Sequence, residues 1–169
     1  MRVIPITIGP ASTHIRIDHQ SLFPIVASLT QSGESDVIKV QIIREDVGRL
    51  LIQARVKAAG VLKTPVIHQL VGWMTPHEPR AIEFEGTNGP VSLLQLRLTM
   101  TEEGGCTNLE YRGAIGRGYW LLGWAMTYLF AKPIVNKALQ CLLTEIKDHA
   151  ERDGAQVSVL TKKCQHSNS

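Results

Sequence analysis

The chain has 169 residues, of which 44% are hydrophobic and 20% are charged, a composition typical of one globular domain and unlike that of a disordered chain. The formal net charge is +3, and the longest basic run is the pair Lys162 and Lys163. The sequence therefore lacks the basic patch expected of a nucleic-acid-binding protein.

The first 35 residues combine short β-prone segments with one apolar cluster. The β-prone segments lie on either side of a Gly-Pro pair within residues 3–17, and the apolar cluster covers residues 22–29. The cluster predicts a short helix that Asp18 or Ser21 could cap. Pro24 is tolerated in this helix if it falls in the first turn, where its missing N–H has no helical partner to lose.

From residue 37 to residue 112 the apolar residues recur with a period of two, which is typical of strands with one buried face. Residues 50–58 and 94–100 show the alternation most regularly, and turn residues separate the segments at short intervals. Parallel pairing would need connections of a dozen or more residues, so connections this short favour antiparallel pairing. The sequence predicts a meander of roughly six antiparallel strands.

The last part of the chain changes to a period near 3.6. An apolar stripe over residues 135–150, with charged residues away from it, predicts a long amphipathic helix. Asp153 and Gly154 are a plausible stop, because glycine readily adopts the left-handed conformation found after a last helical turn. We therefore expect a folded domain over residues 1–154 and a polar tail over residues 155–169.

About half of the aromatic residues lie in residues 119–130, just before this helix. The segment is compatible with a short helix, is apolar on nearly every side, and is followed by a bend expected near Pro133. It could be plain core, the wall of a ligand cavity, or a surface that meets a membrane or a partner. Tyr and Trp suit the last two roles, because each joins a large apolar body to one hydrogen-bonding group.

The three cysteines, Cys106, Cys141 and Cys164, are an odd number at wide spacings without a CxxC pair. This pattern suggests neither zinc nor a redox dithiol and favours a reduced, cytoplasmic protein. The apolar run at residues 3–8 is too short for a secretory signal. The uncharged apolar stretch at residues 118–131 is shorter than the roughly twenty residues of a membrane span.

The sequence lacks the common local motifs of catalysis and cofactor binding. GxSxG, the Walker A pattern, HExxH and the EF-hand loop are all absent, and the six histidines show no metal-ligand spacing, so we expect no cofactor and no metal. The run GAIGRG at residues 113–118 does not have the spacing of a dinucleotide fingerprint, and a tight chain reversal is favoured over anion binding. His68 stands among apolar residues and is a candidate for ligand contact or acid–base work.

This order of elements resembles the START-like, or SRPBCC, helix-grip superfamily, which includes polyketide cyclase/dehydrase proteins and a group of accessory proteins of carbon monoxide dehydrogenase. The resemblance spans about residues 12–152. It is most specific in LTMTEEGGCTNLEYRGAIGRGYWLL, where an acidic-glycine turn and a T-x-L-x-Y strand lead toward the final helix, and in LLTEIKDHAE. The short segment before residue 37 has room for only one helix where many members have two.

The resemblance implies an α+β fold in which a curved antiparallel sheet of six or seven strands wraps around the C-terminal helix and encloses a hydrophobic pocket. A pocket of this kind selects apolar ligands by burial, and one or two polar groups fix their orientation. The candidates for these polar or catalytic groups are His68, Arg97 and Tyr111. The residues expected to bind the ligand are Ile52, Ala54, Trp73, Phe84, Leu96, Leu98, Tyr111, Trp120, Trp124 and Tyr128.

Three functions compete at this point. The first is binding or transport of a hydrophobic small molecule such as a lipid, polyketide, sterol or quinone, because no complete catalytic set is visible. The second is an enzyme of the cyclase or aromatase type, in which a Tyr, His or Arg assists proton transfer. The third is an accessory protein resembling those of carbon monoxide dehydrogenase, in which the segment 119–130 meets a membrane or a protein partner.

Overall fold

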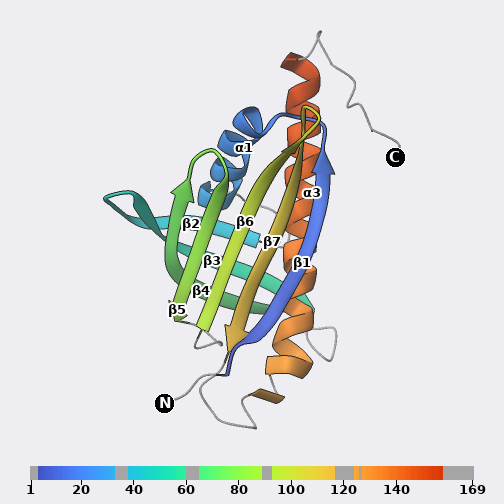
Figure 1. Ribbon diagram of the computed structural model, residues 1–169. Helices are drawn as coiled ribbons and strands as arrows, with labels where there is room; N and C mark the ends of the chain where they lie inside the picture. The colour runs from blue at the N-terminus through green and yellow to red at the C-terminus, as the bar shows by residue number, and fades with distance from the viewer. Residues whose placement is uncertain are drawn as a thin grey trace.

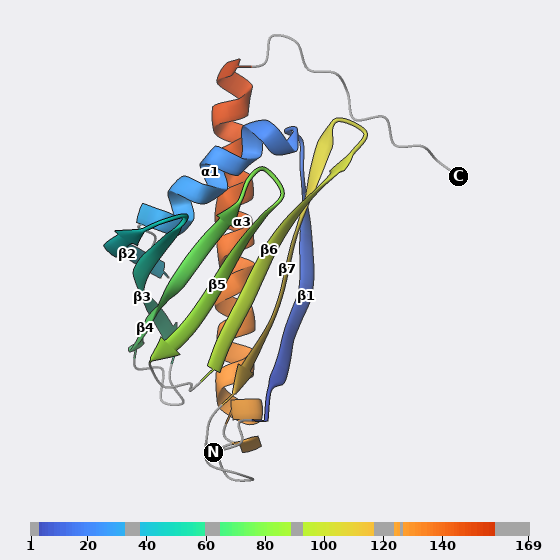
Figure 2. The ribbon, with the colours of Figure 1, turned by 60° about the vertical axis from the view of Figure 1, so that its left-hand side comes forward.

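The computed structural model describes residues 4–32, 38–59, 65–88, 93–116, 124–125 and 127–157. Within these residues the chain forms one seven-stranded sheet, with α1 and α3 on the same side of it (Figures 1 and 2). Every neighbouring pair of strands is antiparallel, in the order β1-β7-β6-β5-β4-β3-β2. The α+β class and the helix-against-sheet arrangement are therefore confirmed.

The predicted meander of roughly six strands is also confirmed, because β2 to β7 pair consecutively, and β1 adds a seventh strand by pairing with β7. The strands are β1 (Ile6–Ile15), β2 (Ile38–Asp46), β3 (Arg49–Ala59), β4 (Pro65–His77), β5 (Ala81–Asn88), β6 (Leu93–Glu103) and β7 (Cys106–Gly116). The helical elements are α1 (His19–Ser32), the five-residue η1 (Thr127–Ala131) and α3 (Lys132–Val157).

β1 is a single strand where the Gly-Pro pair was expected to separate two segments. The register against β7 shifts between Ile8 and Ala11, so Gly9 and Pro10 form an irregularity inside the strand instead of ending it. Gly9 has a φ of 74°, in the region that glycine tolerates best. Its N–H, turned out of the regular ladder, donates to Oδ1 of Asn136 on α3 at 3.2 Å. The irregularity thus ties the edge strand to the helix.

α1 begins as predicted at an Asp18 cap. Oδ1 of Asp18 accepts from the backbone N–H of Ser21 at 2.9 Å, and Oδ2 accepts from the Ser21 hydroxyl at 2.7 Å. These hydrogen bonds, above all the one from the Ser21 backbone, lower the pKa of the Asp18 carboxyl. Pro24, however, is the sixth residue of α1. It therefore lies beyond the first turn, where we expected a proline to be tolerated.

α3 is longer than predicted. It runs past the expected stop at Gly154 and ends at Val157, and Pro133 is its second residue. The expected break near Pro133 corresponds to the junction of η1 and α3. Among the described helices, none combines the length and the apolar character needed to cross a membrane.

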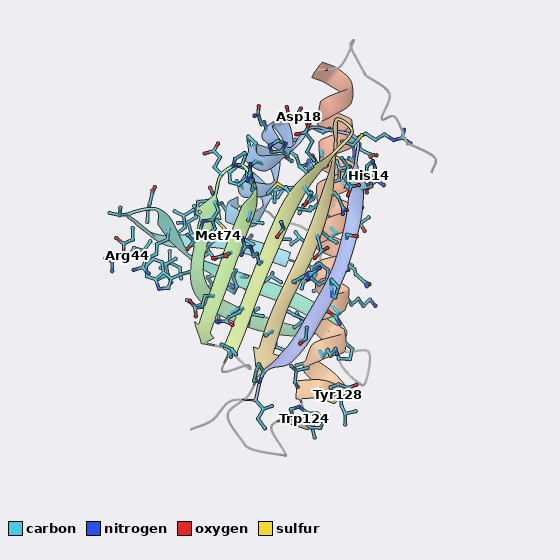
Figure 3. All side chains as sticks on the ribbon, viewed as in Figure 1. His14, Asp18, Arg44, Met74, Trp124 and Tyr128 are labelled. Carbon is cyan, nitrogen blue, oxygen red and sulfur yellow. The ribbon has the colours of Figure 1, made fainter. Side chains whose placement is uncertain are left out.

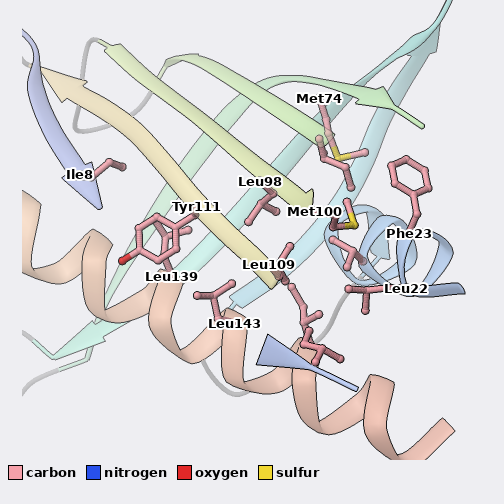
Figure 4. Close-up of a cluster of buried hydrophobic side chains, with 14 of the residues drawn as sticks. Ile8, Leu22, Phe23, Met74, Leu98, Met100, Leu109, Tyr111, Leu139 and Leu143 are labelled. Carbon is pink, nitrogen blue, oxygen red and sulfur yellow. The ribbon is translucent and has the colours of Figure 1, made fainter. Parts of the chain in front are cut away.

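The core lies between the sheet and the two helices. Tyr111 and Leu109 of β7 point toward Leu139 and Leu143 of α3, and Phe23 of α1 lies beside the far end of the sheet (Figure 4). The inward strand residues expected from the alternation lie in this layer. The fully buried members of the core are Ile8, Ile15, Leu22, Val26, Leu109, Ile115, Ile146 and Ala150.

Two cysteines differ in state. Cys106, at the start of β7, is buried and disulfide-bonded, whereas Cys141 on α3 is half-buried and free. The expectation of reduced cysteines therefore fails at Cys106. An odd count at wide spacings carries no information on which residues approach each other in the fold, so the pairing could not be predicted.

Candidate functional site

The inner face of the sheet, which faces α1 and α3, is closed beside β1. α3 packs mainly along β1 and also contacts β3 and β7. Ile8, Leu109 and Ile115 on β1 and β7 are fully buried, as is Ile146 on the facing helix. Close packing of this kind leaves no apolar surface there for a ligand to cover.

On β2 to β6 the inner face is closed only in part, because Ile52, Met74 and Ile82 are buried there while other apolar side chains are not. A second group of apolar side chains lies beside the core but stays partly exposed. This group consists of Val40, Leu50, Leu70, Phe84 and Leu96. We name it the open face and add the half-buried Ala54, because Ala54 alternates with Ile52 on the same face of β3. Its members come from β2 to β6, and their pairing in the ladders places Leu70 opposite Ala54 and Phe84 opposite Leu96.

Two glycines lie between the members of the open face. Gly72 on β4 pairs with Gly86 on β5, so no side chain rises from the centre of this part of the sheet. A Cβ on Gly72 would lie 2.4 Å from the carbonyl oxygen of Glu85, because the register shift beside it brings the two backbones together. Gly86 is less restricted, since its Cβ would meet the ring of Phe84 at 3.1 Å. The glycine pair keeps the floor of the open face free of side chains.

One flank of α3 faces the open face. Asn136 marks the opposite flank, because its Oδ1 accepts from Gly9 of β1. Successive residues of a helix are about 100° apart, which places Val135 and Leu142 on the flank away from Asn136. Both side chains are apolar and partly buried, as is Ala131 just before the helix. The helix therefore contributes further uncovered apolar surface on the side where the sheet is open.

Tyr111 and Asn136 form a polar pair in this otherwise apolar interior. The Tyr111 hydroxyl lies 3.5 Å from both the backbone oxygen and Oδ1 of Asn136, at the outer limit of a hydrogen bond. Burial raises the pKa of the Tyr111 phenol, so it stays protonated at neutral pH and can donate a hydrogen bond. In the part of the chain that the structure describes, no group of three or more His, Cys, Asp or Glu side chains could hold a metal ion.

Most strand residues named from the sequence as ligand contacts lie on the inner face. Ala54, Phe84 and Leu96 belong to the open face, whereas Ile52, Leu98 and Tyr111 are buried in the core beside it. The open face also includes Val40 and Leu70, and the facing flank of α3 includes Val135 and Leu142, which the sequence did not single out as candidate ligand contacts. The helical period had already placed Val135 and Leu142 on the apolar stripe, but not on its exposed flank.

Trp73 and Arg97 lie on the outer face, away from the helices. Trp73 pairs with Leu51 and Glu85, and the guanidinium of Arg49 stands 4.3 Å from its ring centroid. Arg97 is 59% exposed and its guanidinium lies 3.2 Å from the carboxylate of Glu83. Side chains alternate between the faces of a strand, so neither residue shares the face of its apolar neighbours. The structure does not bring these two residues to the open face.

Four candidate ligand-contact residues remain, and the structure describes the side chains of two of them. The backbone of His68 pairs with Val56 in the β3–β4 ladder, but its side chain, like all of Trp120, lies outside the described residues. Trp124 and Tyr128 are 39% and 47% exposed and stack on each other with ring centroids 5.4 Å apart. They lie at the start of α3, far from Asp18 and Met74 (Figure 3). The structure places them on the surface and not inside the core.

Comparisons with known proteins identify the fold. No protein-family model matches the sequence, and no curated protein matches it. Among solved structures, the chain is similar to the Zhui aromatase/cyclase from Streptomyces sp. R1128, with a TM-score of 0.69, 14% identity and coverage of 94% of this chain and 98% of that one. It is also similar to TTHA0849 from Thermus thermophilus, with a TM-score of 0.68, 10% identity and coverage of 88% and 99%.

A third similar structure is a START superfamily protein from Mycobacterium smegmatis, with a TM-score of 0.58, 15% identity and coverage of 88% of this chain and 97% of that one. Identities this low establish the arrangement of the backbone and leave activity to the site itself. The sheet order, the long C-terminal helix against the sheet and these likenesses together show that the chain has the helix-grip fold of START-like proteins.

Proposed function

We propose that the protein binds a hydrophobic small molecule between the open face of the sheet and α3. One observation carries this proposal: the apolar side chains of the open face remain partly exposed although they lie beside the core. Covering apolar surface contributes about 25 cal/mol per Å², so a ligand that fills this region gains affinity from burial alone. Sites that bind small molecules typically combine such an apolar lining with a few polar groups.

The chemistry of the lining favours a largely apolar ligand. The open face and the facing flank of α3 consist of aliphatic side chains and one phenylalanine. A lipid, polyketide, sterol or quinone fits this description, and the similarity to an aromatase/cyclase makes a molecule that can close into an aromatic ring the class to test first. The Tyr111 hydroxyl is buried beside Asn136, on the flank of α3 away from the open face, so a ligand meets it only by reaching past the open face into the core.

Filling the open face tests this proposal. Leu70 belongs to the open face, and its neighbour Gln69 is exposed on the outer face of the same strand. In Leu70→Trp the larger side chain occupies the ligand's space, so binding of a neutral hydrophobic dye such as Nile red, measured by fluorescence titration, weakens about tenfold. Gln69→Trp adds the same indole outside and leaves the titration unchanged. Equal binding by Leu70→Trp and wild type contradicts the proposal.

A cyclase or aromatase is the second candidate function. The observation that favours it is the protonated, buried phenol of Tyr111, which could donate a proton to a developing enolate in the ligand. Under this alternative, Tyr111→Phe lowers turnover of an aromatic polyketide precursor about a hundredfold or more while dye binding persists. If Tyr111→Phe turns over such a precursor as fast as wild type, Tyr111 is not the acid.

Contact with a membrane or a protein partner through residues 119–130 adds to this function without replacing it. The exposure of Trp124 and Tyr128 supports such a contact. A carrier of hydrophobic molecules must also meet the place where its ligand resides, and an exposed aromatic pair suits that encounter.

A further inference from the structure

One end of the molecule carries a cluster of exposed apolar side chains. Trp124 and Tyr128 stack with an interplanar angle of 15°, and Leu129 beside them is 63% exposed. Ile4, just before β1, is exposed as well. The start of β1 and the start of α3 lie at the same end of the molecule, so these residues share it (Figure 3). We name this cluster, together with Lys132, the aromatic end.

A lysine lies beside the aromatic rings. Nζ of Lys132 lies 5.1 Å from the centroid of the Tyr128 ring. The sequence has Arg117, Lys132 and Lys137 but no acidic residue between residues 113 and 144. It also has no acidic residue before Asp18, which lies at the opposite end of the molecule (Figure 3). This end therefore combines exposed aromatic rings with a lysine that has no acidic residue near it along the chain.

We propose that the aromatic end docks on the surface of an anionic lipid bilayer. Trp and Tyr are favoured at the boundary between headgroups and hydrocarbon, because their rings are apolar and their N–H or O–H stays hydrated. A lysine beside them reaches anionic headgroups while its stem lies along apolar surface. A protein partner would need a matching acidic and apolar surface, whereas an anionic bilayer supplies both features without further specificity.

Docking in this orientation places the proposed binding region near the bilayer. Ala131 and Val135, on the open flank of α3, follow the aromatic pair within about two helical turns. Lipid-soluble ligand could then pass between bilayer and protein over a short path. This exchange step rests on the proposed function, but docking itself requires no ligand.

Vesicle sedimentation of the ligand-free full chain tests the inference. We expect the wild type to sediment with vesicles of phosphatidylcholine and phosphatidylserine, and more weakly with phosphatidylcholine alone. Trp124→Ala/Tyr128→Ala lowers the partition coefficient about tenfold or more, and Lys132→Ala lowers it about fivefold. A matched control is Ile43→Ser/Val47→Ser, which removes exposed apolar side chains from β2 and the turn after it, where Glu45 and Asp46 oppose an anionic surface.

The outcomes separate cleanly. Loss of sedimentation in the aromatic and lysine variants, with the control unchanged, supports the inference; circular dichroism and a thermal melt check that each variant is folded. Absence of sedimentation in the wild type overturns it, as does an equal loss in the control, or self-association through the aromatic end without vesicle binding. Dye titration in vesicle-free buffer measures ligand binding without a bilayer. Ligand binding and membrane docking can therefore be contradicted independently of each other.

Discussion

The two sides of the sheet's inner face bury their side chains differently. Beside β1, residues such as Leu109 and Ile115 are inaccessible to solvent and pack against the helix. Farther along the same sheet, Leu70 and Phe84 carry equally apolar side chains but remain partly exposed. α3 makes most of its contacts with the sheet along β1, which accounts for the close packing there.

This difference indicates a division between stability and binding. The closed side buries most of what holds the fold together, whereas the open face leaves apolar surface that a ligand can cover. Substitutions on the closed side should therefore mainly change the free energy of unfolding. Substitutions on the open face should mainly change ligand affinity, and the following predictions test this separation.

The largest effect is expected from a pair of leucine truncations. Leu109→Ala removes a fully buried side chain and leaves a cavity, which should lower the free energy of unfolding by about 3 kcal/mol or more. Leu70→Ala removes a partly exposed side chain and should lower the free energy of unfolding by about 1 kcal/mol, because Leu70 buries less apolar surface on folding than Leu109 does. Urea denaturation measures both, and equal losses would remove the distinction between the two sides.

The glycine pair gives the second contrast. In Gly72→Ala the new methyl group collides with the backbone of Glu85, so the variant should lose about 2 kcal/mol of unfolding free energy. Gly86→Ala meets only a side-chain ring and should lose less than about 1 kcal/mol. Its methyl group projects into the floor of the open face, so dye binding should weaken although the fold persists. Thermal melts and dye titrations distinguish the two effects.

The cap of α1 gives a smaller, pH-dependent effect. Asp18→Ala should cost about 1 kcal/mol at neutral pH, because two hydrogen bonds to Ser21 are lost. The pKa of Asp18 is lowered in the folded protein, so its contribution is present above the unfolded pKa and disappears as pH falls through the folded pKa. The wild type and the variant should thus converge in stability as the pH falls through the lowered pKa of Asp18. A constant difference across acidic pH contradicts this role.

The smallest effects on stability are expected at Tyr111 and Arg97. Tyr111→Phe keeps the buried ring and loses only contacts of 3.5 Å, so the free energy of unfolding should change by about 0.5 kcal/mol. Arg97→Ala removes an exposed ion pair and should change it by less than about 0.5 kcal/mol. Dye binding should persist in both variants, because Phe keeps the buried ring of Tyr111 and Arg97 lies on the outer face. An effect of Arg97→Ala on dye binding would contradict this assignment.

Much of the fold could be predicted because strand and helix periods report directly on which side chains share a face. The alternation through Leu94, Leu96 and Leu98 indicated the inner face of β6, and it also placed Arg97 on the outer face. Naming Arg97 as a ligand-orienting group conflicted with that alternation. Trp73 was harder to place, because a large aromatic side chain suits the inner face by hydrophobicity and the outer face when a guanidinium covers it.

The openness of the site could not be predicted from periodicity. Leu50 and Ile52 follow the same alternation, yet only Ile52 is buried, because the path of the helices across the sheet decides which residue is covered. The same limit applies to Trp124 and Tyr128. A segment that is apolar on every side has no preferred face, so the sequence left core, cavity wall and surface as open alternatives.

One measurement tests the central claim most directly: a methyl NMR titration of the full chain with a neutral hydrophobic ligand. The account predicts saturable shifts for the methyl groups of Leu50, Leu70 and Leu96 on the open face. It predicts little change for those of Leu109 and Ile146 on the closed side, where the packing admits no ligand. Shifts confined to the closed side, or no saturable shift on the open face, would contradict the account.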